Sequence, residues 1–208
     1  MPRFEVVLFD LDGTLVDSSA LILESFHGTT EAVLGRRFPD DEILALVGGG
    51  SPAKQMAVLE PAHVEALVRE YDARIGTAYD AVECFAGVAG VLEELKRRGC
   101  RLGVVSAKRA EIVERAFTGA GIADCFDVVV GSDATQRHKP DPEPILHALS
   151  LVGATPAQAA YVGDSPFDAS AAKAAGVFAV AVGWGGIHRV EDADVFVETP
   201  EELLDVLG

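Results

Sequence analysis

Aspartates follow two short apolar runs of the sequence, one near the N-terminus and one near residue 160. The four are Asp10, Asp12, Asp164 and Asp168. A carboxylate can act as a nucleophile, as a general acid or base, or as a ligand to a hard cation. If the four share one crevice, each pair repels by about 4 kcal/mol at about 4 Å before screening. We therefore expect a divalent cation there, and because only oxygen ligands are on offer we expect Mg²⁺.

A serine and a lysine complete the set of residues that could do chemistry. Ser106 follows a third apolar run, and Lys139 lies in the segment His138-Lys139-Pro140. The lysine adds positive charge and could hold a phosphoryl oxygen. Aspartates, a cation and a hydroxyl group in one crevice would suit a small anionic substrate.

Five nearly continuous apolar runs predict the strands that position these residues, because strands buried on both faces have this pattern. The runs span residues 6–9, 102–105, 127–130, 160–162 and 177–182. Helical patterns alternate with them, among them an Ala-rich helix over 169–175 that ends before Gly176. This order predicts an α/β fold, a doubly wound, Rossmann-like parallel sheet of about five to six strands. Ligands of such sheets bind outside the carboxyl ends of the strands, where the aspartates and Ser106 lie.

The interval from residue 9 to residue 102 is too long for a single crossover. Its apolar positions repeat at helical spacing, and glycines 48–50 interrupt the pattern. We predict that residues 17–82 form a helical bundle, a cap inserted after the first strand, with hinges near 14–17 and 80–87. Residues 1–16 and 83–208 would form the Rossmann-like core. The alternative is a helical layer that is merged with the core and does not move separately.

The chain of 208 residues is strongly acidic, with 17 Lys and Arg against 33 Asp and Glu and a formal net charge of −16. This balance argues against nucleic acids and anionic membranes as partners. The three cysteines lie far apart, which indicates neither a disulfide framework nor a zinc site. With no apolar stretch near ~20 residues and no secretory signal, we expect a cytoplasmic protein, either a monomer or a homodimer.

In their order along the chain, these motifs resemble those of the haloacid dehalogenase-like hydrolase superfamily. Phe9-Asp10-Leu11-Asp12-Gly13-Thr14-Leu15 is similar to the first motif, and Ser106 to the second. Lys139-Pro140 is similar to the third motif, and Gly163-Asp164-Ser165-Pro166-Phe167-Asp168 to the fourth. The resemblance covers the whole chain, including the helical insert.

The resemblance implies a role for each aspartate. Asp10 would attack phosphorus and form an aspartyl-phosphate, and Asp12 would protonate the leaving oxygen and later activate water. Mg²⁺ would be bound by the carboxylates of Asp10 and Asp164 and by the backbone carbonyl of Asp12. Asp168 would assist the metal through water or orient Lys139. Asp12 also favours phosphoryl transfer over carbon–halogen cleavage, since dehalogenase-type members lack this carboxylate.

The second and third motifs would bind the phosphoryl group. The resemblance implies that Ser106 and Lys139 hold its oxygens. Ala107 stands where many relatives have Asn or Gly, so that its backbone N–H alone could donate to phosphate. Lys108 follows, and it could face either the substrate or only solvent.

The whole pattern resembles the phosphoglycolate phosphatases and the related pyrophosphatases. It implies a Mg²⁺-dependent phosphatase that hydrolyses a small phosphorylated substrate, phosphoglycolate-like or pyrophosphate. Specificity would come from the cap, where Arg36, Arg37 and above all Lys54 could bind substrate. A sugar-phosphate mutase of the β-phosphoglucomutase type is the alternative, because it shares the nucleophile and the second Asp. A non-catalytic phosphate-sensing or partner-binding protein is the third hypothesis.

Overall fold

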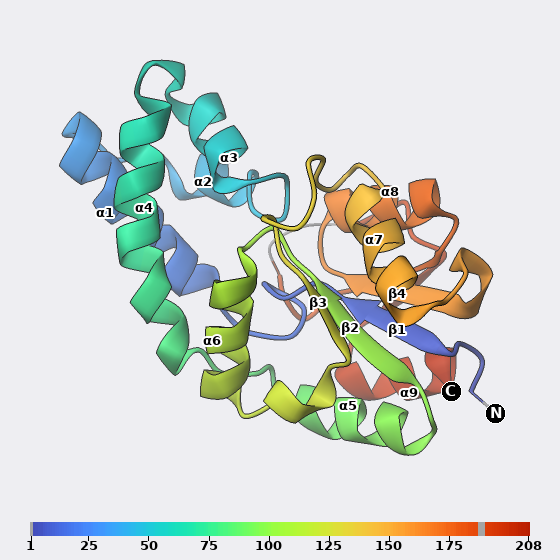
Figure 1. Cartoon of the computed structure of the whole chain (residues 1–208). Coiled ribbons are helices and arrows are strands. Elements are labelled where there is room, and N and C mark those ends of the chain that lie inside the picture. The colour runs from blue at the N-terminus through green and yellow to red at the C-terminus, as the bar shows by residue number, and fades with distance from the viewer. Residues whose placement is uncertain (1, 187–189) are drawn as a thin grey trace.

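The computed structural model describes residues 2–186 and 190–208. Its centre is a parallel sheet with the strand order β3-β2-β1-β4-β5-β6 (Figure 1). The strands are β1 (Val6–Phe9), β2 (Arg101–Val105), β3 (Val128–Val130), β4 (Ala159–Gly163), β5 (Phe178–Val182) and β6 (Val195–Val197). Because every pair is parallel, the carboxyl ends of all these strands lie at one edge of the sheet.

Helices cover both faces of the sheet. Alternate side chains of β1 enter two different apolar clusters, with Val7 and Phe9 on one face and Val6 and Leu8 on the other. The Val6 face packs against α7 (Glu143–Val152) and α8 (Pro166–Ala175). The Val7 face packs against α5 (Val88–Arg97), α6 (Ala110–Ala120) and α9 (Leu203–Leu207). This two-sided cover explains why the strands read as nearly continuous apolar runs.

A group of helices lies between β1 and α5 in the chain and to one side of the sheet in Figure 1. They are α1 (Ser19–Leu34), α2 (Asp40–Leu44), α3 (Pro52–Leu59) and α4 (Val64–Ala78). Helices α1 and α4 pack side by side, with the rings of Phe26 and Tyr71 4.9 Å apart. None of the helices in the described part of the chain has the length and apolar character needed to cross a lipid bilayer.

The two segments that join these helices to the sheet run antiparallel to each other. The backbone N–H of Asp17 donates to the carbonyl of Glu83 at 3.0 Å, and that of Phe85 donates to the carbonyl of Leu15 at 3.1 Å. The chain therefore leaves the sheet and returns to it through one short hydrogen-bonded ribbon.

The α/β class and the doubly wound parallel sheet are confirmed, with β6 as an edge strand outside the five predicted runs. The predicted start of the Ala-rich helix at residue 169 is wrong, because α8 begins at Pro166. Ser165 caps the helix by accepting from the backbone N–H of Asp168, while the Asp168 side chain accepts from the backbone N–H of Ser165. Such a capping box fixes the first turn, and it places Asp168 inside the helix.

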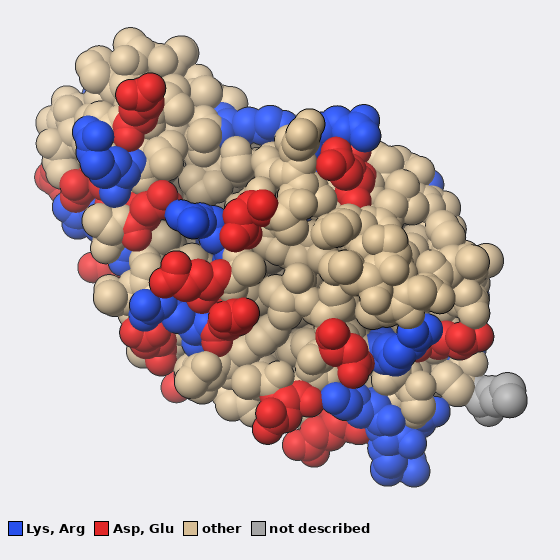
Figure 2. All heavy atoms as spheres, viewed as in Figure 1, with Lys and Arg blue, Asp and Glu red and all other residues tan. Residues whose placement is uncertain are grey.

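Charged side chains of both signs are interspersed on the face shown in Figure 2, without a continuous basic area on that face. Several are paired locally, such as Arg97 with Glu94 and Arg137 with Glu143. Exposed pairs of this kind contribute little to stability, because water screens them.

Candidate active site

The strand order brings three of the sequence motifs together. Strand β1 lies between β2 and β4, and Phe9 is in register with both Val104 and Val162. The residues that directly follow these strands are Asp10, Ser106 and Asp164. This is the position where the connections of a doubly wound sheet diverge to opposite sides and leave a crevice.

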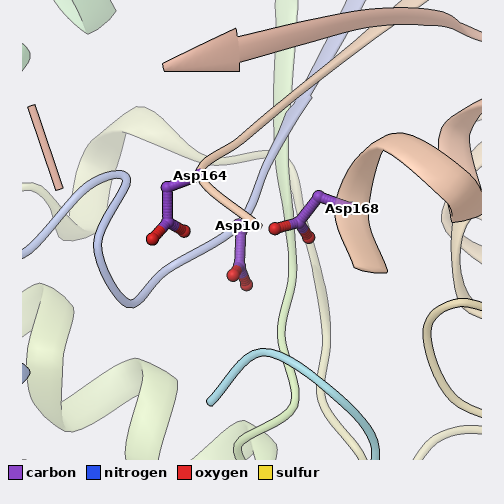
Figure 3. A group of neighbouring side chains, drawn as sticks. All are labelled: Asp10, Asp164 and Asp168. Atoms are coloured by element: carbon purple, nitrogen blue, oxygen red, sulfur yellow. The ribbon is translucent and has the colours of Figure 1, made fainter. Parts of the chain in front are cut away.

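Three of the four predicted carboxylates form one buried group. Oxygen atoms of Asp10, Asp164 and Asp168 all lie within 4.8 Å of one another (Figure 3). Gly13 makes room for this group, because a Cβ atom at that position would collide with the Asp164 carboxylate. The Thr14 hydroxyl donates to Asp164 Oδ1 at 3.2 Å.

The Lys139 ammonium lies against this carboxylate group. Its Nζ is 2.9 Å from Asp10 Oδ1 and 2.6 Å from Asp168 Oδ1, and it donates to the Tyr161 hydroxyl at 3.1 Å. The single hydrogen of the Tyr161 hydroxyl is shared between the backbone carbonyl of Val105 at 3.0 Å and Asp168 Oδ1 at 3.2 Å. Three partners thus orient a lysine whose side chain is only 2% exposed.

Burial and charge together set the protonation of this group. Burial is the main reason that the pKa of Asp10 rises from 3.8 to about 7, although Lys139 opposes the rise. Burial, followed by repulsion from Asp168 and Asp10, raises the pKa of Asp164 well above 3.8. Burial by itself disfavours a charged Lys139, but Asp10 and Asp168 outweigh it and raise its pKa. When all three buried carboxylates are ionised, the single ammonium leaves an excess of negative charge, which a divalent cation would neutralise.

Asp168 uses both carboxylate oxygens for contacts within the protein. Oδ1 accepts from Lys139 at 2.6 Å and from Tyr161 at 3.2 Å. Oδ2 accepts from the backbone N–H of Ser165 at 3.0 Å and from the Ser165 hydroxyl. Of the two roles expected for Asp168, these contacts favour orientation of Lys139.

Asp12 lies in a separate hydrogen-bond network. Its Oδ1 accepts from the Ser18 hydroxyl at 2.6 Å and from the Tyr79 hydroxyl, and its Oδ2 lies 3.4 Å from Lys108 Nζ. The Asp12 side chain is thus held by partners different from those of Asp10. Two neighbouring aspartates with separate partners can take separate roles in one reaction.

The segment after β2 is buried throughout. Ser106 is 5% exposed, Ala107 is 8% exposed, and the Ser106 Oγ accepts from the backbone N–H of Lys108 at 3.1 Å. The Ser106 hydroxyl keeps its own hydrogen for donation. Of the two alternatives for Lys108, exposure to solvent alone is wrong, because the residue is 5% exposed and lies beside Asp12.

The glycine segment lies over the fourth motif. A Cβ atom at Gly48 would come within 2.9 Å of the Ser165 hydroxyl, and one at Gly49 within 2.7 Å of the Phe167 ring. Lys54, the predicted substrate-binding residue of the insert, is exposed on α3. Burial of His138 lowers the pKa of its imidazole, and the positive charge of Lys54 lowers it further. Arg36 and Arg37 are also exposed, and they pair on the insert with Glu60 and Glu31.

Several partners in the site lack an obvious signal in the sequence. Tyr71, Tyr79 and Tyr161 belong to runs that read simply as apolar core. The Ser165-to-Asp168 spacing of a capping box is a readable signal for the position of Asp168.

Comparison with known proteins decides the family, since the model of the haloacid dehalogenase-like hydrolases matches residues 7–182. The chain belongs to this family. A pyrophosphatase named PpaX from Bacillus anthracis is 33% identical over 209 residues, covering 99% of this chain and 94% of the relative. The family assignment and this full-length likeness show that the chain is a hydrolase.

Solved structures show the same fold. A haloacid dehalogenase-like hydrolase from Bacteroides fragilis has a TM-score of 0.89 and 28% identity, with 97% of this chain and 100% of that chain covered. A protein from Haemophilus somnus described as a predicted phosphoglycolate phosphatase has a TM-score of 0.87 and 24% identity, with 99% of each chain covered. At this lower identity the likeness is one of fold alone.

Proposed function

We propose that this hydrolase is a Mg²⁺-dependent phosphatase that acts on a small phosphate ester or on pyrophosphate through an aspartyl-phosphate. The observation that carries the proposal is that the carboxylates of Asp10 and Asp12 contact different partners. Asp10 lies with Lys139 at the carboxyl end of the central strand β1, whereas Asp12 is held separately by Ser18 and Tyr79. The relatives named pyrophosphatase support a phosphoryl group as the target.

In the first half-reaction an Asp10 oxygen attacks phosphorus, and the bond from phosphorus to the leaving oxygen breaks. Asp12 transfers its proton to that oxygen, so that the leaving group departs with a hydroxyl group at this atom. In the second half-reaction Asp12 takes a proton from water, which attacks the phosphorus of the aspartyl-phosphate. The bond to Asp10 breaks, phosphate leaves, and both carboxyl groups return to their starting states.

The phosphoryl oxygens would be held by donors at the ends of β2 and of the Lys139 segment. The Ser106 hydroxyl, the Ala107 backbone N–H and the Lys139 ammonium are the candidates. These donors are fixed before substrate arrives, since Lys139 is oriented by Asp168 and Tyr161. Fixed donors stabilise developing charge without reorganising during the reaction.

A magnesium ion fits the donor set. The carboxylates of Asp10 and Asp164 and the backbone carbonyl of Asp12 would hold it, as oxygen ligands that Mg²⁺ prefers. When bound, the ion would neutralise the excess negative charge of the group and lower the repulsion that an incoming phosphate meets.

We further propose that residues 17–82 are a cap that opens to admit substrate, on a core of residues 1–16 and 83–208. Asp10, Asp12 and Lys139 are each at most 5% exposed, so a substrate can reach them only if a covering element moves. The antiparallel ribbon at Asp17 and Glu83 would act as the hinge, because only two chain segments cross it.

The decisive experiment is phosphate release from a substrate panel by the purified protein with Mg²⁺ or with EDTA. The panel contains phosphoglycolate, pyrophosphate, β-glucose-1-phosphate, a nucleoside monophosphate and an aryl phosphate. We expect phosphate release that depends on Mg²⁺ and that EDTA abolishes. A folded Asp10→Asn variant should release phosphate at less than about 1% of the wild-type rate, because an amide cannot attack phosphorus. Release in EDTA or in Asp10→Asn would refute the mechanism.

The same panel separates the other hypotheses. A mutase would isomerise β-glucose-1-phosphate and depend on a hexose bisphosphate, whereas a phosphatase releases phosphate without it. A non-catalytic phosphate-binding protein would bind members of the panel without turnover.

A further inference from the structure

A second buried lysine lies beside the proposed acid/base. The Lys108 ammonium is 3.4 Å from Asp12 Oδ2 and donates to the Tyr71 hydroxyl at 3.3 Å. It also lies 5.9 Å from the ring centres of both Tyr71 and Tyr79. With a side chain 6% exposed, this cation is as inaccessible as the catalytic centre itself.

Two protein groups contact this ammonium. An ammonium has three N–H donors, and within residues 2–186 and 190–208 Lys108 has one hydrogen bond and one longer ion pair. Lys139, by comparison, has Asp10, Asp168 and Tyr161 within 3.1 Å. Asp12 and Tyr71 thus stabilise the charge of Lys108 and, among the described residues, leave one N–H donor for a partner that arrives with the substrate.

The position of Lys108 tells which part of a substrate it would meet. In the proposed mechanism Asp12 donates a proton to the leaving oxygen, so that oxygen must come within hydrogen-bond distance of Asp12. An ammonium 3.4 Å from the same carboxylate lies within reach of groups one or two bonds beyond the leaving oxygen. Lys139, paired with Asp10, is instead next to the phosphoryl group that is transferred.

We propose that Lys108 is a specificity-determining residue that binds an anionic substituent of the leaving group, in a site lined by Tyr71 and Tyr79. This inference rests on the proposed phosphatase function. Two groups share the required chemistry, the second phosphoryl group of pyrophosphate and the carboxylate of a phosphorylated hydroxy acid. Both place a negative charge a short distance beyond the leaving oxygen.

The cations of the insert are less suited to this role. Arg36 and Arg37 are paired with glutamates on the exposed surface, and Lys54 is itself exposed. An ion pair formed in water gains little, whereas a buried charge-assisted hydrogen bond contributes more. Lys108 is therefore the cation whose contact with substrate would discriminate most strongly.

The test compares Lys108→Met with wild type on three substrates: pyrophosphate, phosphoglycolate and phenyl phosphate, whose leaving group carries no charged substituent. The quantity is the kcat/KM for each anionic substrate divided by that for phenyl phosphate. We expect this ratio to fall roughly 10- to 150-fold for the substrate that Lys108 recognises, chiefly through KM. Lys108→Arg should recover part of it. Lys173→Met, at a half-exposed lysine paired with Asp192, is the matched control and should leave the ratio unchanged.

The substrate with the larger fall identifies the anionic group. An equal fall on all three substrates would overturn the proposal, because it would mean that Lys108 only positions Asp12 or supports the fold. An unchanged ratio would overturn it as well. A binding measurement that needs no turnover compares Asp10→Asn with the double variant Asp10→Asn/Lys108→Met. The ligands are pyrophosphate and phosphoglycolate. Weaker binding of one ligand to the double variant supports the Lys108 proposal even if the wild-type protein hydrolyses nothing. Equal binding of each ligand to the two proteins refutes it.

Discussion

Replacing Asp168 by Asn tests whether this residue orients Lys139 or binds the metal. The carboxylate accepts two hydrogen bonds on each oxygen, from Lys139 and Tyr161 on one side and from Ser165 on the other. Asparagine keeps one acceptor oxygen, so its NH₂ group must face donors on one side. If the oxygen stays toward Lys139, the ammonium still donates to it, but the acceptor is a neutral amide in place of a carboxylate.

We take the loss of the acceptor's charge to weaken the contact by about 1 to 1.5 kcal/mol. We therefore expect kcat/KM at saturating Mg²⁺ to fall about 5- to 13-fold in Asp168→Asn. The Mg²⁺ concentration for half-maximal activity should change little. In Asp164→Asn, where a proposed ligand is lost, that concentration should rise steeply.

The assay is steady-state phosphate release from phenyl phosphate across a Mg²⁺ titration, with thermal unfolding to show that both variants are folded. If Asp168→Asn shifts the titration more than Asp164→Asn does, and excess Mg²⁺ restores its full rate, then Asp168 is a direct ligand. That result would refute the positioning role inferred from its four hydrogen bonds.

Three further predictions concern pH, closure and the cap. Because the pKa of Asp10 is about 7 in the fold and 3.8 in the reference state, its stabilising contribution is complete below pH 3.8 and is lost as pH rises to about 7. In EDTA the Tm of the wild-type protein should thus fall relative to that of Asp10→Asn as the pH rises from 3.8 to about 7. Parallel curves of Tm against pH would contradict the raised pKa of Asp10. Gly49→Ala should raise KM on every substrate, because the added Cβ would lie 2.7 Å from the Phe167 ring, whereas Gly76→Ala, with no atom within 4 Å, should not. Lys54→Ala should raise KM for the preferred substrate more than for phenyl phosphate, but by less than Lys108→Met does, because Lys54 is exposed. An unchanged KM would assign Lys54 to solvent.

The sequence alone was enough to predict which polar residues directly follow the strands of the sheet. Buried strands have a continuous apolar pattern, and polar residues directly after three of them mark the carboxyl ends of β1, β2 and β4. Since parallel strands end at one edge, Asp10, Ser106 and Asp164 could be assigned to one crevice without knowledge of any side-chain direction.

The sequence did not predict how the side chains divide into two networks. Asp10 and Asp12 are only two residues apart, yet Asp10 pairs with Lys139 and Asp12 with Ser18, Tyr79 and Lys108. Apart from Ser18, these partners come from distant parts of the chain, and whether they meet depends on how the insert packs against the sheet. For the same reason Lys108 was ambiguous between substrate and solvent.

Only the tertiary structure decided these points, because the identity of a residue does not say what covers it. A lysine after a strand is solvated if nothing lies above it, and it becomes a buried cation when two tyrosines of the insert pack there. Likewise Asp168 is four residues from Asp164, but in the fold its oxygens face protein donors, Ser165 in the capping box of α8 and Lys139. Strand periodicity is a local property of the chain, whereas burial and hydrogen-bond partners are properties of the assembled fold.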